Sequence, residues 1–590
     1  MALATWLLVI GIVFYIVAYL TYGRGLSRSV VRTDDSRPTP AHALYDGVDY
    51  APGHPLAIFG HHFASIAGAG PIVGPAIAVV WGWLPALLWI WLGNVIIGAV
   101  HDYLSVMASV RSEGKSIQWI AGKVMRPGTA RIMMVFIYLT LMLVVAAFIS
   151  VAGTNFAAMP GVATASLLFI VAAIVFGLMY YRAKINFTLS TIVGLLLVAA
   201  SIWIGFRYWE LQASFHTWVI VLAIYALVAA SLPVWLLLQP RDYLNAYILF
   251  VGMIAGVVAM IASGKGMALP AYTFWSAPAV GNVPSPFWPA IPLVVACGSL
   301  SGFHSLVASG TTSKQLDKES HGLFVGYGGM LTEGLLATLV TVTMGGYGLQ
   351  ALATASDKIA ALGVTLDQMA HNATYFGQSF LKAAGAIGGA VGVFNRSFGE
   401  ALSDVFGLSA RFGATFAGLW VTAFVLTTLD TATRLARFTW QEFFEPLRQS
   451  RPALHKVLNN RWLAGLVVVV VAGWLAWGGS YNVLWPAFAG ANQMVAAIAL
   501  LTAALWAIKV QKAAAGYRWA TVIPGMFLWI TVFAGLLWYL WVVPATWVIR
   551  VVTAAMAVLA VVLLVYFLDG YRRDLPLAAA PPAAGAGVAR

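Results

Sequence analysis

The chain has 590 residues, of which 61% are hydrophobic and only 9% carry a charge. Soluble globular proteins are about 25% charged, so this composition excludes a soluble domain and predicts a polytopic membrane protein. The formal net charge of +13 does not indicate nucleic-acid binding, because the basic residues fall in short loops between apolar runs. The first apolar run, 2–21, lacks the basic start and the small-residue cleavage pattern of a signal peptide, so we predict a retained span.

Apolar runs of about 20 residues can cross a bilayer as helices, and about fifteen such runs follow one another along the chain. The predicted spans lie at 2–21, 56–80, 84–110, 131–155, 163–181, 186–206, 217–238, 244–262, 290–312, 323–346, 411–431, 461–477, 484–508, 519–541 and 546–568. We therefore predict an all-α polytopic membrane protein, with an ambiguous Gly/Ala-rich stretch at 376–407. The single cysteine, Cys297, lies in an apolar run and excludes an intrachain disulfide.

Basic residues gather in alternate loops, for example at Arg24, Arg111 and Arg434, and loops of this kind face the cytoplasm. The pattern places the N-terminus on the outer side of the membrane and the C-terminus inside. It holds only if 376–407 makes no net crossing, so we predict a re-entrant or surface-lying element there. The Ala/Pro/Gly-rich tail, 571–590, is predicted to be disordered and cytoplasmic.

The span that begins at residue 56 contains a Gly-Ala-Gly-Pro break where an ordinary helix keeps its hydrogen bonds. Freed backbone groups at membrane depth are tolerated only where protein or a water-filled cavity receives them. The unwound turn offers amides to a carboxylate, and the positive end of the following half-helix favours an anion. Close helix contact through small residues is the alternative interpretation. The candidate substrate-binding residues of this break are Ala67, Gly68, Ala69, Gly70 and Pro71.

A second proline-containing segment repeats part of this pattern. Aligning ASIAGAGPI, 64–72, with ALVAASLPV, 226–234, matches two alanines and pairs Pro71 with Pro233. By the loop charges the two copies run in opposite directions, as the halves of inverted-repeat transporters do. Chance composition is the alternative, because alanine and proline are common in membrane helices. The second copy adds Ser231 and Pro233 to the candidate substrate-binding residues.

His304 and Glu333 lie in the middle of predicted spans, where an ionisable group is costly without a function. His304 is a candidate for binding substrate or a proton. Glu333 is a candidate proton carrier and, in a peptide site, a partner for the substrate amine; a structural bond to a neighbouring helix is the alternative. The hydroxyls of Ser309, Thr311 and Thr312 could coordinate sodium, or they could bond back to their own helix.

Other polar residues lie near the predicted cytoplasmic ends of spans and are candidates for ion coupling or for an inner gate. His61 and His62 could relay protons or cap the interface. Three acidic residues each have a charged or ionisable neighbour in the sequence, and snorkelling ion pairs explain them equally well: Asp102 after His101, Asp242 after Arg241, and Asp430 before Arg434. The candidate ion-coupling or gating residues are His61, His62, Asp102, Gln239, Asp242, Ser309, Thr311, Thr312, Glu333 and Asp430.

Four long blocks of sequence are more specific than any of these short patterns. They read GHHFASIAGAGPIVGP with the following GAVHDYLSV, then LPVWLLLQPRDYLNAYILF, SGFHSLVASGTTSKQL and TTLDTATRLARF. Together they resemble the carbon starvation protein A family of bacterial inner-membrane transporters, nearly along the whole chain. The resemblance implies uptake of small carbon sources such as pyruvate or short peptides, and it makes the outer side the periplasm. It also implies a five-plus-five inverted-repeat core similar to that of the amino acid/polyamine/organocation transporters.

The implied architecture assigns the discontinuous helices to 56–80 and 217–238, with 290–312 as a core helix beside the first. Extra helices then flank the core at both ends, the C-terminal ones as scaffold or oligomer surface. The resulting division is a first span and loop at 1–55, a core at 56–431 with repeats 56–210 and 211–431, a basic cytoplasmic segment at 432–461, and accessory spans at 462–570.

Motifs of other function classes are missing from the sequence. The sequence contains no HExxH motif and no GxSxG motif with partners, which would indicate an enzyme. It also contains no P-loop, which would indicate an ATP motor, and no repeated filter loop, which would indicate a channel. We expect a secondary active transporter without a cofactor or metal site, coupled to protons or sodium, that acts on a small molecule or peptide. A membrane nutrient sensor or a channel-like protein is the alternative. The substrate, the coupling ion and the oligomeric state stay open.

Overall fold

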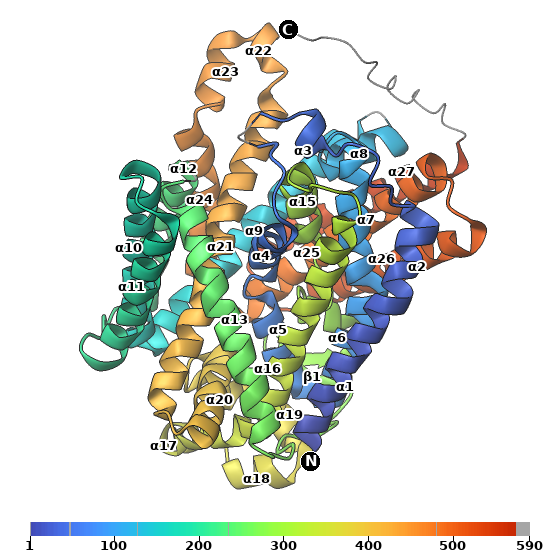
Figure 1. The fold of residues 1–590 in the computed structure, drawn as a ribbon. Coiled ribbons are helices and arrows are strands. Elements are labelled where there is room, and N and C mark those ends of the chain that lie inside the picture. Colours follow the sequence, from blue (N-terminus) through green and yellow to red (C-terminus); the bar gives the residue numbers. More distant parts are fainter. Residues whose placement is uncertain (1, 47–48, 127, 234, 479–480, 574–590) are drawn as a thin grey trace.

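The computed structural model describes residues 2–46, 49–126, 128–233, 235–478 and 481–573. Within these ranges 12 helices are long and apolar enough to cross a membrane, or up to 13 when a bent pair of helices counts as one span. Figure 1 shows the long helices side by side in one elongated bundle. The predicted all-α polytopic fold is confirmed, whereas the predicted tail beyond residue 573 lies outside the described residues.

Each long helix coincides with an apolar run, because a helix satisfies all of its own backbone groups inside a bilayer. The helices of the bundle are α1 (Leu3–Ala18), α4 (Pro55–Ala67), α5 (Gly70–Ala78), α6 (Trp83–Gly93), α7 (Ala99–Val110), α9 (Thr129–Ala158), α10 (Pro160–Gly177), α11 (Phe187–Arg207), α12 (Phe215–Ser231), α13 (Leu238–Ala262), α15 (Gly302–Gly310), α16 (Gly328–Ala353), α19 (Ala373–Gly385), α20 (Gly389–Phe406), α21 (Ala410–Phe444), α24 (Arg461–Gly478), α25 (Tyr481–Leu505), α26 (Ala515–Val542) and α27 (Trp547–Arg572).

Shorter elements connect these helices at the two ends of the bundle. They are α2 (Arg24–Leu26), α3 (Pro40–Ala43), α8 (Ile117–Val124), α14 (Phe287–Ala290), α17 (Ser356–Ala361), α18 (Leu366–His371), α22 (Leu447–Ser450), α23 (Pro452–Leu458), and an antiparallel hairpin of β1 (Ser276–Val280) and β2 (Val283–Pro286). In the hairpin, Ser276 lies opposite Pro286 and Val280 opposite Val283.

Three of the fifteen predicted spans are not among the 12. The segment 56–80 forms the pair α4 and α5, which are bent by 45° at their junction. The segment 217–238 forms α12, which has only 17 residues and ends before a separate α13 begins. The predicted continuous helix at 290–312 is wrong, because the backbone is not helical between 294 and 301. Hydropathy measures composition, and composition does not report where backbone hydrogen bonding is interrupted.

The basic loops meet at one end of the bundle. Arg32 donates a hydrogen bond to the carbonyl of Lys512 at 3.4 Å, and Arg126 forms an ion pair of 2.9 Å with Asp569 near the end of α27. In Figure 1 this basic end carries α3, α8, α22 and α23, and the opposite end carries the N-terminus, α17 and α18. Loops that are far apart in sequence therefore share one side, as the alternation of charge predicts.

The ambiguous segment 376–407 forms α19 and α20 at the end opposite to the basic loops (Figure 1). Neither is among the helices long and apolar enough to cross a membrane, as expected for a re-entrant or surface-lying element. Acidic side chains of α20 form hydrogen bonds with α16. Glu400 accepts a hydrogen bond from Gln350 at 2.7 Å, and Asp404 accepts one from Tyr347 at 2.7 Å.

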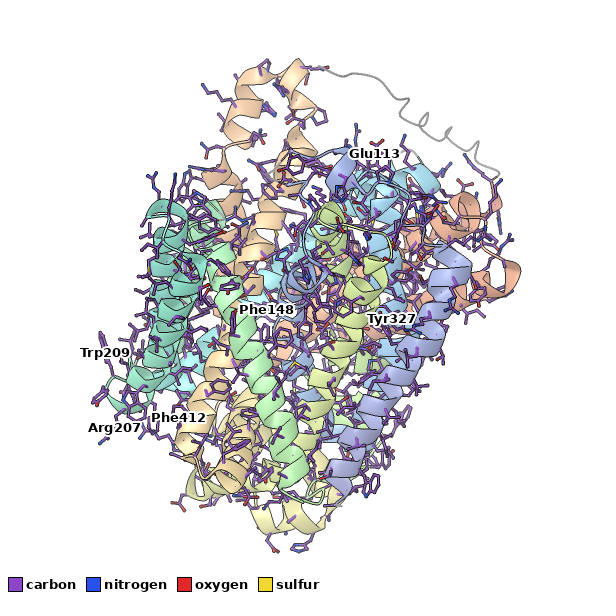
Figure 2. The ribbon with its side chains drawn as sticks, viewed as in Figure 1. Glu113, Phe148, Arg207, Trp209, Tyr327 and Phe412 are labelled. Carbon is purple, nitrogen blue, oxygen red and sulfur yellow. The ribbon has the colours of Figure 1, made fainter. Side chains whose placement is uncertain are left out.

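The interior of the bundle is built from α9, α21 and α25. Phe148 of α9, labelled near the middle of the molecule in Figure 2, lies with its ring centroid 5.4 Å from that of Phe488 and 6.2 Å from that of Trp485, both on α25. The span that contains α25 is 83% buried in its most apolar window, so this helix belongs to the core and not to an outer scaffold or oligomer surface. α21 has 35 residues and extends beyond the other helices to α22 and α23 (Figure 1).

Candidate functional site

α4 and α5 meet at the predicted Gly-Ala-Gly-Pro break. Gly68 has a φ of +42°, a left-handed conformation that glycine adopts without strain. A Cβ at Gly68 would lie 2.9 Å from Oγ1 of Thr428, so the backbone approaches α21 closely at this point. The five candidate residues of the break, 67–71, are all buried. The predicted interruption of the first core helix is therefore present, and the freed backbone is enclosed by protein.

A second irregular segment, 294–301, lies directly against α5. A Cβ at Gly74 would come within 2.7 Å of the Val294 carbonyl oxygen, and a Cβ at Gly298 within 3.3 Å of Cα of Pro71. A Cβ at Gly70 would overlap the side chain of Cys297. Two interruptions of helical hydrogen bonding thus face each other. Gly70 also bears out the alternative interpretation for its own position, close contact through a small residue.

Side chains of α25 satisfy the backbone of this second segment. Asn492 accepts a hydrogen bond from the Phe303 amide at 2.9 Å and donates one to Oγ of Ser301 at 2.9 Å. Gln493 donates to the Val295 carbonyl at 2.5 Å. Irregular backbone at membrane depth requires partners of this kind. These two amides were not predicted, although a polar pair inside an apolar helix is a recognisable signal.

The second predicted proline break does not face the first. α12 ends at Ser231, and Pro233 is exposed in the turn that follows. Arg434 of α21 donates to the Leu232 carbonyl at 2.9 Å, and Arg437 donates to the Ala230 carbonyl at 3.0 Å. These arginines cap a helix C-terminus, where cations are favourable. Pro233 is therefore exposed at the end of α12, whereas the segment that lies against Pro71 is 294–301.

A continuous row of ionisable side chains, the buried histidine–carboxylate chain, lies next to the two breaks. One carboxylate oxygen of Asp102 lies 2.8 Å from Nδ1 of His101, and the other lies 2.8 Å from Nδ1 of His304. Nε2 of His304 in turn lies 3.4 Å from a carboxylate oxygen of Glu333. All four side chains are 0% exposed. His304 and Glu333, both predicted as ionisable residues inside the membrane, therefore lie next to each other. Asp102 is buried with them and is not a charge that snorkels to the membrane surface.

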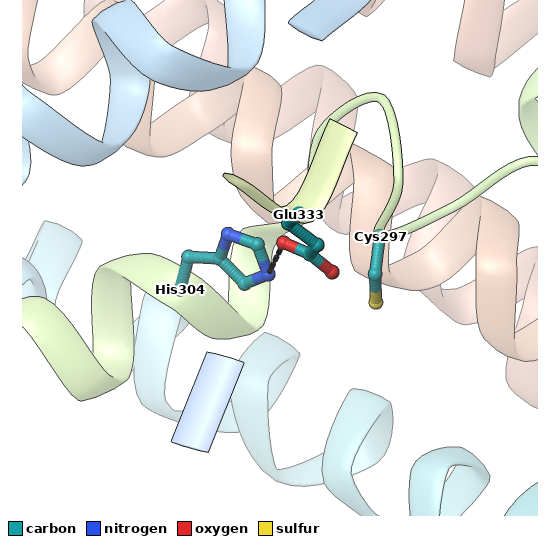
Figure 3. Close-up of side chains that lie close together, drawn as sticks. All are labelled: Cys297, His304 and Glu333. Carbon is teal, nitrogen blue, oxygen red and sulfur yellow. Dashed lines mark ion pairs between the residues drawn. The ribbon is translucent and has the colours of Figure 1, made fainter. Parts of the chain in front are cut away.

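Cys297 lies beside His304 and Glu333 of the histidine–carboxylate chain. Its sulfur, one imidazole nitrogen of His304 and one carboxylate oxygen of Glu333 all lie within 4.8 Å of one another. Figure 3 shows the Glu333 carboxylate between the His304 ring and the Cys297 side chain, which comes from the irregular segment. Cys297 was not among the candidate residues.

The predicted sodium-binding hydroxyls already have partners. Ser309 donates to the Ser305 carbonyl at 2.7 Å, and Thr311 donates to the Val307 carbonyl at 3.0 Å, so both bond back to the helix backbone. Oγ1 of Thr312 lies 2.8 Å from Nδ1 of His62. His62 is fully buried beside α16, whereas its neighbour His61 is only partly buried and lines a cavity.

Charged residues at the start of α13 pair with α21 in a way that the sequence did not indicate. Arg241, 0% exposed, forms an ion pair with Asp430 and a second, of 3.2 Å, with Asp242. Tyr225 donates a hydrogen bond to Asp430 at 3.1 Å. The predicted neighbour of Asp430, Arg434, instead caps α12. Gln239 accepts a hydrogen bond from Tyr181 at 3.2 Å and lies outside the site.

A cavity of about 450 Å³ lies at the basic end of the bundle and reaches Ser65, one helical turn before the break in α4. Its polar lining includes His61, Asp242, Ser309, Lys314 and Arg434. Among the described residues, none of the histidine–carboxylate chain lines this cavity. This cavity therefore approaches the two breaks from the basic side without reaching the histidine–carboxylate chain.

The chain is similar in sequence to proteins of one known family. The chain matches the family described as "Carbon starvation protein CstA" over residues 3–535. It is 33% identical over 541 residues to "Peptide transporter CstA" of Bacillus subtilis (strain 168), covering 88% of this chain and 87% of the relative. It is 32% identical over 584 residues to "Pyruvate/proton symporter BtsT" of Escherichia coli (strain K12), covering 89% and 80%.

Among solved structures, a manganese transporter of Eremococcus coleocola aligns with 90% of this chain and 99% of its own, at 13% identity and a TM-score of 0.43. A similarity of this size carries no weight for fold or function. The family match covers residues 3–535 of the chain, the range in which the two breaks and the histidine–carboxylate chain lie. The chain belongs to the carbon starvation protein CstA family.

Proposed function

We propose that the chain is a secondary active transporter that imports small carboxylate nutrients, either pyruvate or short peptides, by ion-coupled alternating access. The observation that carries this proposal is the buried histidine–carboxylate chain, which lies beside two facing interruptions of helical backbone. Transporters place substrate and coupling-ion sites at such interruptions near the bilayer midplane. Relatives named as a peptide transporter and as a pyruvate/proton symporter support the same substrate classes.

The substrate carboxylate binds at the N-terminus of α5. The helix dipole and the amides of Ala69 and Gly70 favour an anion at this end of α5, which the break at Gly68 leaves free of a preceding helical turn. Pro71 has no amide hydrogen, and the Ile72 amide already donates to the Ala69 carbonyl at 3.1 Å. Pyruvate and the C-terminus of a peptide both present a carboxylate. In a peptide site, Glu333 also supplies the negative charge for the substrate amine.

The coupling ion is a proton, carried by the histidine–carboxylate chain. Ionisable groups inside a membrane are costly, and four of them linked in a row are typical of proton relays. Two hydroxyls predicted to coordinate sodium have other partners, since Ser309 and Thr311 donate hydrogen bonds to carbonyls of their own helix. The relative named as a pyruvate/proton symporter supports this choice.

The proposed location is the bacterial inner membrane, with the N-terminus in the periplasm and the basic end in the cytoplasm. The cavity next to His61 and Ser65 then opens towards the cytoplasm, so this conformation faces inward. The ion pair of Arg241 with Asp430 lies beside that cavity and contributes to the inner gate.

The test is uptake of labelled pyruvate and labelled dipeptides into proteoliposomes under imposed proton or sodium gradients. Saturable uptake with counterflow, driven by an inward proton gradient, is the expected result. Uptake that does not saturate would indicate a channel, and absence of uptake of either substrate would favour a sensor. Glu333→Gln is expected to abolish peptide uptake while pyruvate still binds; full activity of this variant on both substrates would remove Glu333 from the mechanism.

A further inference from the structure

We propose that Cys297, His304 and Glu333 form a binding site for a divalent transition-metal ion of the zinc class. The three residues come from the irregular segment 294–301, from α15 and from α16, so the fold brings together donors that are distant in the sequence. One donor atom from each residue lies within 4.8 Å of the other two. This three-residue cluster differs from the sequence expectation, which includes no metal site.

The spacing suits an ion with short bonds. Zinc binds imidazole nitrogen and carboxylate oxygen at about 2.0 Å, and in a tetrahedral site two such donors lie about 3.3 Å apart. Nε2 of His304 and the nearer carboxylate oxygen of Glu333 are 3.4 Å apart. Zinc–sulfur bonds are longer, about 2.3 Å, which places a bound sulfur about 3.5 Å from the other two donors. The sulfur of Cys297 lies within 4.8 Å of both, so a small approach of its side chain completes the site.

The nitrogen and oxygen donors are buried and have no hydrogen-bond partner among the described residues. They are Nε2 of His304 and both carboxylate oxygens of Glu333. Buried polar atoms are normally satisfied, and each exception calls for an explanation such as an ion. Figure 3 shows the carboxylate of Glu333 and the ring nitrogen of His304 directed at each other beside Cys297.

The surroundings of the cluster prepare its donors for a metal. Asp102 accepts the Nδ1 proton of His304 at 2.8 Å, which leaves the lone pair of Nε2 facing the cluster. A carboxylate behind a ligating histidine is the usual second partner in zinc sites, where it fixes the tautomer and the ring orientation. The amide of Asn492 lies 3.9 Å from the sulfur of Cys297 and can stabilise a thiolate.

The donor types select the class of ion. A thiolate with an imidazole and a carboxylate suits zinc and its neighbours in the first transition row, whereas sodium, magnesium and calcium prefer oxygen donors only. Three protein ligands leave one position of a tetrahedral ion for water or another donor. The proposal is therefore a site with an open position, not a closed structural site.

Metal and proton exclude each other at these atoms. Binding requires the thiolate, the unprotonated Nε2 and the ionised carboxylate, so the thiol proton and any proton shared by Nε2 and the carboxylate leave to solvent. This step rests on the proposed function, in which His304 and Glu333 carry the coupling proton. A bound ion then inhibits proton-coupled uptake, and it does so less at lower pH.

The first experiment measures binding without reference to transport. The purified full-length protein, with any affinity tag removed, is titrated with Co²⁺ and followed by thiolate-to-cobalt absorption, and bound Zn²⁺ is measured by elemental analysis. We expect one ion per chain. Cys297→Ser should abolish the absorption, and Asp102→Asn should weaken binding about tenfold or more, as loss of a carboxylate hydrogen-bonded to a ligating histidine does. His371→Gln is the control, because its pairing with Asp367 is exposed on α18.

Equal zinc content and equal Co²⁺ spectra in the wild-type protein and Cys297→Ser would overturn the site. Thermal unfolding of each variant separates loss of binding from loss of fold. Cys297→Ala serves as a second variant if the serine variant is unstable.

The second experiment measures uptake with and without added Zn²⁺ at two pH values. Inhibition that weakens at the lower pH, and that Cys297→Ser removes, supports the shared site. If metal binds but uptake is insensitive to it, the metal site stands and the proton role of His304 and Glu333 fails. If no metal binds while proton-driven uptake is normal, the metal site fails and the proposed function stands.

Discussion

Nδ1 of His304 lies 2.8 Å from a carboxylate oxygen of Asp102, and both side chains are completely buried. The hydrogen bond fixes which ring nitrogen of His304 faces Glu333, and it places a negative charge behind the ring. We predict that Asp102→Asn lowers the maximal rate of proton-driven uptake by at least about tenfold, the range found when such a partner is lost. Initial rates in proteoliposomes between pH 5 and 8 test this.

The matched control is Asp367→Asn, which removes a carboxylate from a histidine–aspartate pair on the surface. His371 and Asp367 lie 3.3 Å apart with side chains 77% and 83% exposed. This variant should keep wild-type rates and pH profile. Equal behaviour of the two variants would show that the buried pair has no special role.

Gly70 lies so close to Cys297 that no side chain fits between them. Gly70→Ala should lower the thermal midpoint and reduce uptake of both substrates, because a Cβ would overlap Cys297 and overpacking costs about 1–3 kcal/mol. Gly60→Ala in α4 is the control, since nothing lies within 4 Å of a Cβ there. A Gly70→Ala protein with normal uptake would contradict the close approach of the two breaks. Cys297→Gly should restore part of the loss, because it removes the atoms that the new Cβ meets.

Asn492 holds the irregular segment from a helix outside the predicted core. Asn492→Leu keeps the volume but leaves the Phe303 amide and Ser301 without their partner, which costs about 1–3 kcal/mol when the groups stay buried. We expect a lower thermal midpoint and a lower affinity for substrate. Asn482→Ala, which removes only an exposed bond of 3.1 Å to Asn282, should change neither. Calorimetry or fluorescence-based unfolding in detergent, with uptake at several substrate concentrations, makes the comparison.

Arg241 and Asp430 form a fully buried ion pair. Asp430→Ala removes the main counter-charge of a buried guanidinium, and breaking such a pair costs about 3–5 kcal/mol. The variant should unfold at a clearly lower temperature, and Arg241→Met combined with Asp430→Leu should recover part of the loss. Glu210→Ala breaks the exposed pair with Arg411, whose effect should stay below about 1 kcal/mol. Equal destabilisation by the buried and the exposed change would contradict the assignment.

The orientation can be tested with introduced thiols, since the sole native cysteine is buried. Asp357 of α17 and Lys456 of α23 are exposed, and these two helices lie at opposite ends of the bundle in Figure 1, so we replace each residue with cysteine. A membrane-impermeant maleimide should label Asp357→Cys in intact cells and label Lys456→Cys only after the membrane is opened. The parent chain is the control and should not be labelled in either case. The reverse pattern would place the basic end outside and reverse the inferred direction of the cavity.

Much of the fold could be predicted from the sequence. Twelve of the predicted spans correspond to long helices, and Gly68 marks a real break, because composition and glycine–proline patterns report directly on membrane helices. The segment 294–301 could not be recognised, since VVACGSLS is apolar enough to pass as helix. Its irregular backbone depends on Asn492 and Gln493, which are almost 200 residues away.

The candidate site was predicted in part. His304 and Glu333 were identified because an ionisable group within a span is costly wherever it lies. Asp102 was placed near an interface from its distance to the end of the span, but α7 is surrounded by protein, so that distance does not measure exposure to water or lipid. The partner of Asp430 was likewise misjudged, because the neighbour one turn away, Arg434, is bound by α12 and the fold supplies Arg241 instead.

α21 runs for 35 residues, about 52 Å at the rise of an α-helix, and the hydrocarbon layer is only about 30 Å thick. The helix that carries Asp430 and Thr428, the residue beside Gly68, is therefore longer than the membrane is thick. It extends out of the membrane at the end that is followed by α22 and α23. A small tilt of α21 near the proposed substrate site therefore produces a larger displacement of its C-terminal end. A fluorophore at Arg448 in α22 should report each opening and closing of the carrier from a position outside the proposed substrate and proton sites.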